Sequence, residues 1–129
     1  MEKDLVVVGG SAAGITAAKT CRKHFPERSV LLIRKEEKVP IPCGIPYIFG
    51  TVDLEDNMIS DDTLENDGIE YMVDEVVGIN REENTVSTES GKEIGYKKLV
   101  LATGSTPNKP PISGIDKENV YTVKKNVPH

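Results

Sequence analysis

The sequence contains only two cysteines, Cys21 and Cys43, in 129 residues. Two cysteines are too few for a disulfide scaffold, and alone they cannot supply the four ligands of a structural zinc site, so we expect no metal. Long apolar runs are also missing. The longest, at Leu5–Val8, Val30–Ile33 and Leu99–Ala102, are far too short to span a bilayer, so no membrane partner is expected.

Positive charge is in deficit: 16 Lys and Arg stand against 21 Asp and Glu, which gives a formal net charge of −5. Because a nucleic-acid surface needs basic residues to neutralise phosphates, this balance argues against a nucleic-acid partner. The opening residues, Met-Glu-Lys-Asp, lack the basic flank and apolar stretch of a signal peptide and predict a cytoplasmic location. With 37% apolar and 29% charged residues, the length predicts one small globular domain.

The amino-terminal part of the chain predicts a β–α–β unit. Leu5–Val8 is a buried strand, residues from Ala12 to about His24 form an amphipathic helix that Pro26 ends, and Val30–Ile33 is a second buried strand. Such a crossover is right-handed and implies a parallel sheet.

Prolines dominate the next segment, Val39–Tyr47, and predict stiff, extended chain. A helix begins near Cys43, since Pro46 is tolerated only in a first turn. Ser60–Asp62 then predicts the start of a short helix that Gly68 ends. Five further strands are expected, at Ile69–Val73, Val76–Asn80, Thr85–Thr88, Glu93–Tyr96 and Leu99–Ala102. The proline-rich end divides the chain into a domain at residues 1–108 and a linker at residues 109–129.

A glycine-rich loop joins the first strand to the first helix. Its residues are Gly9, Gly10, Ser11, Ala12, Ala13 and Gly14. Gly9, Ser11 and Gly14 occupy the three positions of the dinucleotide fingerprint, where they allow a tight turn, the approach of a diphosphate and close helix–strand packing. The amides that open the helix would face the phosphates. This loop predicts nucleotide binding.

The end of the second strand normally carries an acidic residue that binds ribose hydroxyls. Here Arg34 and Lys35 come first, and Glu36 is the candidate if the strand is longer than predicted. The basic pair could instead contact a phosphate, and a solvated run of charges is the third alternative.

Taken in order, these motifs resemble the N-terminal part of the flavin-dependent pyridine nucleotide-disulfide oxidoreductases. The resemblance rests on Gly9–Gly14, Pro42–Tyr47 and Tyr96–Pro107, with support from Glu75–Asn80 and Pro111–Gly114. It is greatest to the single-cysteine branch of coenzyme A-disulfide reductases, NADH oxidases and persulfide reductases. It implies a Rossmann-like FAD/NAD(P)-binding α/β fold, with a parallel sheet, helices and a small antiparallel β-meander, incomplete relative to the family.

Residues along the whole chain are candidates for FAD contacts. They are Gly9, Gly10, Ser11, Ala12, Ala13, Gly14, Arg34, Glu36, Cys43, Val76, Ala102, Thr103 and Gly104. The resemblance implies that Val76 meets the adenine through its backbone and that residues 102–104 close over the flavin nucleotide. The family normally has Glu where Arg34 stands and Gly where Ser11 stands. No histidine precedes His24, whereas peroxidases and water-forming oxidases of the branch carry one in the phosphate loop, which favours disulfide or persulfide reduction.

Cys43 is the candidate catalytic residue. A thiolate is the reactive form of cysteine, and the start of a helix favours it. No second cysteine is close in sequence, so Cys43 would cycle through a mixed disulfide, a persulfide or a sulfenic acid. The resemblance implies that a nicotinamide reduces FAD, that electrons pass to the Cys43 sulfur, and that its thiolate attacks the substrate disulfide. The alternative is an inert structural cysteine, which is the expectation for Cys21 on the apolar helix face.

The resemblance also implies NAD(P)H as co-substrate, a small thiol or disulfide such as coenzyme A, and a homodimer in the full-length family. Thr16, Arg22 and Lys23 match positions that contact coenzyme A phosphates in relatives, with ordinary surface cations as the alternative. Because the family continues with an NAD(P)H domain and a dimerisation domain, we expect a fragment that is inactive alone. An NADH oxidase, an inactive nucleotide-binding remnant, and an NAD(P) module with Arg34 and Lys35 on a 2′-phosphate stay open.

Overall fold

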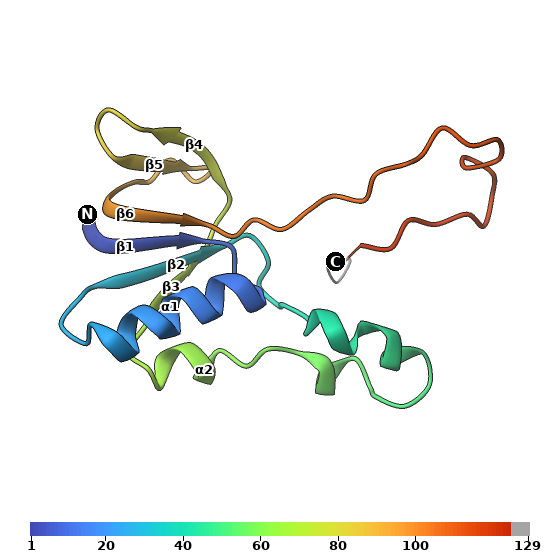
Figure 1. Ribbon diagram of the computed structural model, residues 1–129, viewed down its shortest axis with the longest axis horizontal. Helices are drawn as coiled ribbons and strands as arrows, with labels where there is room; N and C mark the ends of the chain where they lie inside the picture. Colours follow the sequence, from blue (N-terminus) through green and yellow to red (C-terminus); the bar gives the residue numbers. More distant parts are fainter. Residues whose placement is uncertain (125–129) are drawn as a thin grey trace.

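The computed structural model describes residues 1–124 and confirms an α/β fold built on one mixed sheet (Figure 1). The elements in chain order are β1 (Glu2–Val8), α1 (Ala12–His24), β2 (Val30–Arg34), the 3₁₀ helices η1 (Pro42–Phe49) and η2 (Glu55–Asn57), α2 (Asp62–Glu65), β3 (Glu70–Val73), β4 (Val76–Asn80), β5 (Thr85–Thr88) and β6 (Glu93–Leu101). The strands within residues 1–124 run in the order β3-β2-β1-β6-β5-β4. Strands β3, β2, β1 and β6 are parallel to one another. Strands β6, β5 and β4 form the antiparallel meander.

Both faces of the central strands are buried, which explains why β1 and β2 are continuous apolar runs rather than alternating ones. Leu5 and Val7 of β1 pack with Ile15 and Ala18 of α1. Val6 and Val8 face the other way, and pack in a second cluster with meander residues Val86 and Ile94. Figure 1 shows this arrangement, with α1 on one face of the sheet and the meander on the other side of β6.

One expectation about the strands is wrong. Glu93–Tyr96 and Leu99–Ala102 are not two strands, because β6 runs without a break from Glu93 to Leu101. Its first residues pair antiparallel with β5, and residues from Gly95 onward pair parallel with β1. The charged pair Lys97–Lys98 interrupts the apolar pattern and so suggests the end of one strand and the start of another. In the structure the pair is exposed and lies where β6 passes from the meander into the central sheet.

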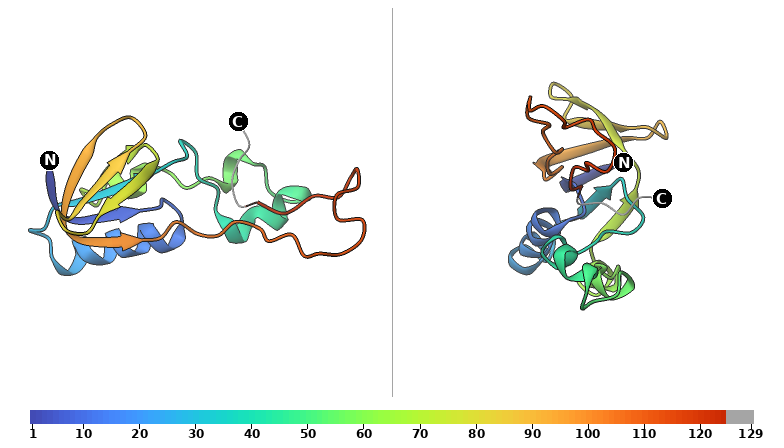
Figure 2. Two further views of the ribbon diagram at one scale, coloured as in Figure 1. Left: turned by 90° about the horizontal axis from the view of Figure 1, so that it is seen from above. Right: turned by 90° about the vertical axis from the view of Figure 1, so that its right-hand side faces the viewer.

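Residues 102–124 contain no helix or strand, and they extend away from the sheet in Figures 1 and 2. This agrees with the unpatterned, proline-rich sequence there, while the division at residue 108 stays a prediction. Residues 125–129 of the predicted linker lie outside the described part of the chain. Over residues 1–124, every helix is too short or too polar to cross a membrane.

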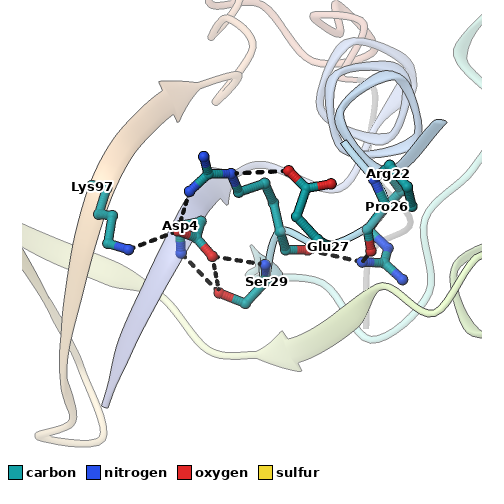
Figure 3. Close-up of polar contacts among 7 residues, drawn as sticks. Asp4, Arg22, Pro26, Glu27, Ser29 and Lys97 are labelled. Atoms are coloured by element: carbon teal, nitrogen blue, oxygen red, sulfur yellow. Dashed lines mark hydrogen bonds and ion pairs between the residues drawn. The ribbon is translucent and has the colours of Figure 1, made fainter. Parts of the chain in front are cut away.

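Asp4 of β1 connects β6 to the loop before β2 at the amino-terminal ends of these strands (Figure 3). Its Oδ1 accepts hydrogen bonds from Lys97 Nζ at 2.8 Å and from Arg28 Nη1 at 3.2 Å. Its Oδ2 accepts from the backbone N–H of Ser29 at 3.0 Å and from the Ser29 hydroxyl at 2.9 Å. The Lys97 ammonium first, and then the Ser29 donors, hold the pKa of Asp4 far below its usual range.

We expect Asp4→Asn to lower the Tm of the chain at neutral pH. A carboxyl whose folded pKa is depressed stabilises the fold above its unfolded pKa of about 4, and this contribution is lost as the pH falls toward the folded pKa. The Tm difference between wild type and Asp4→Asn is therefore full above about pH 5 and shrinks in acid. Thermal melts across this range measure it, with Asp53→Asn at an exposed carboxylate as control. A Tm difference between wild type and Asp4→Asn that does not change with pH would contradict the lowered pKa of Asp4.

Candidate functional site

Gly9 lies where the carboxyl ends of the three central strands meet. Its N–H donates to Ile33 O at the end of β2 at 2.8 Å, and Ala102 N–H donates to Val8 O at 2.8 Å. Gly9 has φ +118°, and a Cβ there would overlap the carbonyl of Ala102. A Cβ on Gly14 would overlap the Gly9 carbonyl in turn. Both fingerprint glycines are therefore required by close packing of backbone, as the sequence predicts.

The amino end of α1 has the properties of a phosphate site. Ser11 is the N-cap residue, but its side chain makes no capping hydrogen bond, and the first turn of α1 contains no acidic residue. The first-turn amides and the positive end of the helix dipole are therefore not neutralised by a carboxylate of α1. Ser11 is half-buried, while Ala12 and Ala13 are exposed, so a diphosphate can approach this turn.

Arg34 points into the protein, which the sequence does not predict. Only 2% of the residue is exposed, and its Nη1 forms an ion pair with Asp61 Oδ1 at 2.7 Å. Nη2 donates to the Glu37 carbonyl at 2.9 Å, and the guanidinium lies over the Tyr71 ring, 4.9 Å from its centroid. The Arg34 stem also fills the space beside Gly10, where a Cβ would collide with it.

The ion pair with Arg34 holds the pKa of Asp61 below its usual value, and burial together with the Asp61 charge raises the pKa of Tyr71. Lys35 pairs with Glu75 at 2.6 Å. Arg34 and Lys35 are thus both engaged by carboxylates, and the geometry does not support a shared 2′-phosphate site. Glu36 is half-buried at the same end of β2 and stays the candidate for ribose contact.

Cys43 is exposed and is the second residue of η1. The helix begins at Pro42, as expected, but it is a 3₁₀ helix, and Pro46 lies inside it rather than in the first turn. A proline in an α-helix interior clashes with the preceding turn, and the tighter i→i+3 pattern is the form adopted here. Figure 1 shows η1 beyond the carboxyl ends of the strands, the edge of the sheet at which α1 also begins.

The remaining candidates for FAD contacts are consistent with backbone contacts. Val76 packs its side chain against the meander core, so the predicted contact would be made by its backbone. Thr103 and Gly104 are exposed directly after β6, and Gly104 has φ +74°. The prediction for Cys21 is confirmed, because it is partly buried against the core beneath α1.

A surface pocket of about 540 Å³ lies along α1 and contains all three predicted substrate residues. It is lined by Thr16, Lys19, Thr20, Arg22, Lys23, Pro26 and Asp67. Arg22 donates to the carbonyls of Pro26 at 2.6 Å, Arg28 at 2.8 Å and Asp67 at 3.2 Å, so its guanidinium is committed to the backbone. Lys19 pairs with Asp67 at 3.0 Å, while Thr16 and Lys23 are exposed.

Comparison with known proteins decides the family. The family model for "pyridine nucleotide-disulphide oxidoreductase" matches residues 3–129. The chain belongs to this family. Its members are flavoprotein oxidoreductases that use FAD and NAD(P)H. The chain is 32% identical to an NADH oxidase of Methanocaldococcus jannaschii, with 92% of this chain and 29% of that protein covered.

Other relatives agree. An NAD(P)H coenzyme A polysulfide/persulfide reductase of Pyrococcus horikoshii is 30% identical over 95% of this chain and 29% of its own length. The solved structure of an NAD-dependent persulfide reductase from A. fulgidus matches with a TM-score of 0.75 and 32% identity, covering 92% of this chain and 24% of that one. The chain thus spans less than a third of the length of these relatives.

Sequence reasoning missed four residues near these sites. Lys19 and Thr20 share the face of α1 with Thr16 and Lys23, a spacing of i, i+3, i+4 and i+7 that helical periodicity could have revealed. Asp61, the partner of Arg34, and Asn57, which lies against Gly44, come from the loop segment between η1 and α2. No local pattern connects that loop to either site.

Proposed function

We propose that the chain is the FAD-binding part of an NAD(P)H-dependent oxidoreductase that reduces a small-molecule disulfide or persulfide through Cys43. The observation that carries this proposal is the placement of an exposed cysteine on η1, beyond the sheet edge where the glycine loop opens α1. The similarity to persulfide reductases supports the substrate class.

The diphosphate part of FAD fits the residues present, because the glycine loop is closely packed and the first turn of α1 contains no acidic residue. The ribose part departs from the family pattern, since Arg34 is turned inward and Glu36 is the acidic residue left at that edge. FAD bound here and reduced by NAD(P)H would supply the two electrons that break the mixed disulfide and return Cys43 to the thiolate.

The step assigned to Cys43 is thiol–disulfide exchange. Its thiolate attacks one sulfur of the substrate disulfide, an S–S bond forms to Cys43, the substrate S–S bond breaks, and the departing thiolate takes a proton from water. Exposure of Cys43 gives the in-line approach that this attack needs. Thr16 and Lys23 line the open pocket on α1 and are proposed to bind phosphate groups of a coenzyme A substrate.

Thermal shift measurements with FAD, riboflavin, NADH and NADPH test the cofactor assignment in this chain. FAD is expected to raise the Tm, because a ligand at about 100 times its Kd stabilises the native state by about 2.7 kcal/mol. Riboflavin lacks the diphosphate and is the matched control that should leave the Tm unchanged. A shift with NADPH alone, or no shift and no yellow colour with FAD, would contradict the proposal.

A further inference from the structure

Asn57 is a buried polar residue directly beside the Cys43 turn. It is 4% exposed and is the last residue of η2, the element that follows η1 in the chain. The segment around it runs antiparallel to the chain that leads into η1, with a bridge between Pro40 and Met58. The N–H of Ile41 donates to the Asn57 carbonyl at 2.8 Å. The η2 segment therefore holds the start of η1 by its backbone.

The side chain of Asn57 adds two further contacts. Its Nδ2 donates to the Ile41 carbonyl at 3.1 Å, the same oxygen that accepts the Gly44 N–H at 3.0 Å. Its Oδ1 lies against Gly44, so closely that a Cβ on Gly44 would overlap it. Gly44 has no positive φ, so the side chain of Asn57, not the backbone conformation, is what excludes a larger residue there.

Cys43 lies between these two anchored points. Ile41 is held on one side and Gly44 on the other, while the Cys43 side chain is exposed. We infer that Asn57 is a positioning residue, which sets the direction of the Cys43 sulfur by fixing the turn from Ile41 to Gly44. This inference rests on the proposed role of Cys43 as the reacting thiol.

The chemistry of the amide suits this task. An amide has both a donor for the Ile41 carbonyl and an acceptor that can lie against the Gly44 backbone. It is neutral, so it adds no negative charge beside a thiolate. Aspartate has the same shape but has no N–H for Ile41, and its charge would face the carbonyl oxygen. Asn57→Asp therefore tests the donor, and Asn57→Ala removes both contacts.

The reactivity of Cys43 measures its position. In a Cys21→Ser background, Cys43 is the single thiol of the chain. The rate of its exchange with 4,4′-dithiodipyridine, a neutral disulfide, is measured in the folded chain and divided by the rate in guanidinium chloride. The parent ratio is expected to differ from one by about tenfold, because a fixed turn sets the directions from which a disulfide can approach the sulfur. Asn57→Ala should move this ratio at least about threefold toward one.

Matched variants separate positioning from stability. Val86→Ala removes packing at a fully buried meander position, so it should lower the Tm and leave the ratio unchanged. Gly44→Ala should alter the ratio as Asn57→Ala does, and the double variant should be no worse than either single one, since the new Cβ displaces the same side chain that Asn57→Ala removes. Where Asn57→Ala does not fold, Asn57→Asp provides the comparison.

The outcomes are distinct. A folded Asn57→Ala or Asn57→Asp chain with the parent ratio overturns the positioning role and leaves the reactivity of Cys43 standing. A parent ratio near one overturns the proposed role of Cys43 as well. An equal change in Val86→Ala shows that reactivity follows stability alone and also overturns the inference.

Discussion

Cys43→Ser is expected to abolish covalent capture of coenzyme A disulfide by this chain. Exchange requires a thiolate that attacks sulfur and then remains joined to it, and a hydroxyl does neither at neutral pH. Cys43 is exposed on η1, whereas Cys21 is partly buried against the core. Almost all of the mixed disulfide should therefore form at Cys43. Intact-mass measurement after incubation with the disulfide detects the adduct.

Cys21→Ser is the matched control for this experiment, and it should give the full adduct. An adduct of undiminished yield in Cys43→Ser would move the reactive thiol to Cys21 and remove the basis of the proposed reaction. If both single-cysteine variants are modified equally and slowly, neither thiol is specially reactive. That result would also contradict the proposal of a reactive site at η1.

Gly9→Ala is expected to disrupt both the fold and FAD binding. Alanine at φ +118° is strained, and its Cβ would overlap the Ala102 carbonyl. Strain of about 1–3 kcal/mol adds to an overpacking cost of about the same size. Because small domains have only about 5–15 kcal/mol of stability in total, a loss of this size is large. Urea unfolding and the FAD-induced Tm shift measure the two effects.

Gly50→Ala is the matched control, since no atom lies close to the position where its Cβ would be. It should change the free energy of unfolding little and leave the FAD shift intact. If Gly9→Ala unfolds completely, Gly14→Ala tests the same packing from the helix side, where the new Cβ would meet the Gly9 carbonyl. Near-wild-type stability in both variants would show that the loop is looser than the structure describes.

At Arg34 the sequence departs from the pattern that the family resemblance implies. The resemblance implies Glu at this position, whereas Arg34 pairs with Asp61 and packs against Gly10. A buried guanidinium needs such partners, because an unpaired charge in the interior is costly. The positive charge of Arg34 is thus directed inward and paired with Asp61, and Glu36 is the acidic residue that remains at this end of β2.

The sequence by itself determined the elements whose causes are local. β1, α1 and β2 follow from apolar runs, helical periodicity and Pro26, and α1 was placed at its observed bounds. In the turns of the meander, Asn84 and Gly91 adopt positive φ, which is typical of these two residue types in turns. The need for glycine at Gly9 and Gly14 could also be predicted from the sequence, because the tight turn at Gly9 and the close packing of Gly14 against it are set within a few residues.

Only the tertiary structure decided which side chains meet across the chain. Arg34 points inward because it pairs with Asp61, the N-cap residue of α2, and stacks on Tyr71 of β3. No sequence pattern near Arg34 indicates partners so distant in sequence. β6 continues through Lys97–Lys98 because two different neighbours share it. Asn57 reaches Gly44 because η1 and η2 pack together. These contacts depend on long-range packing, which residue patterns within one element do not encode.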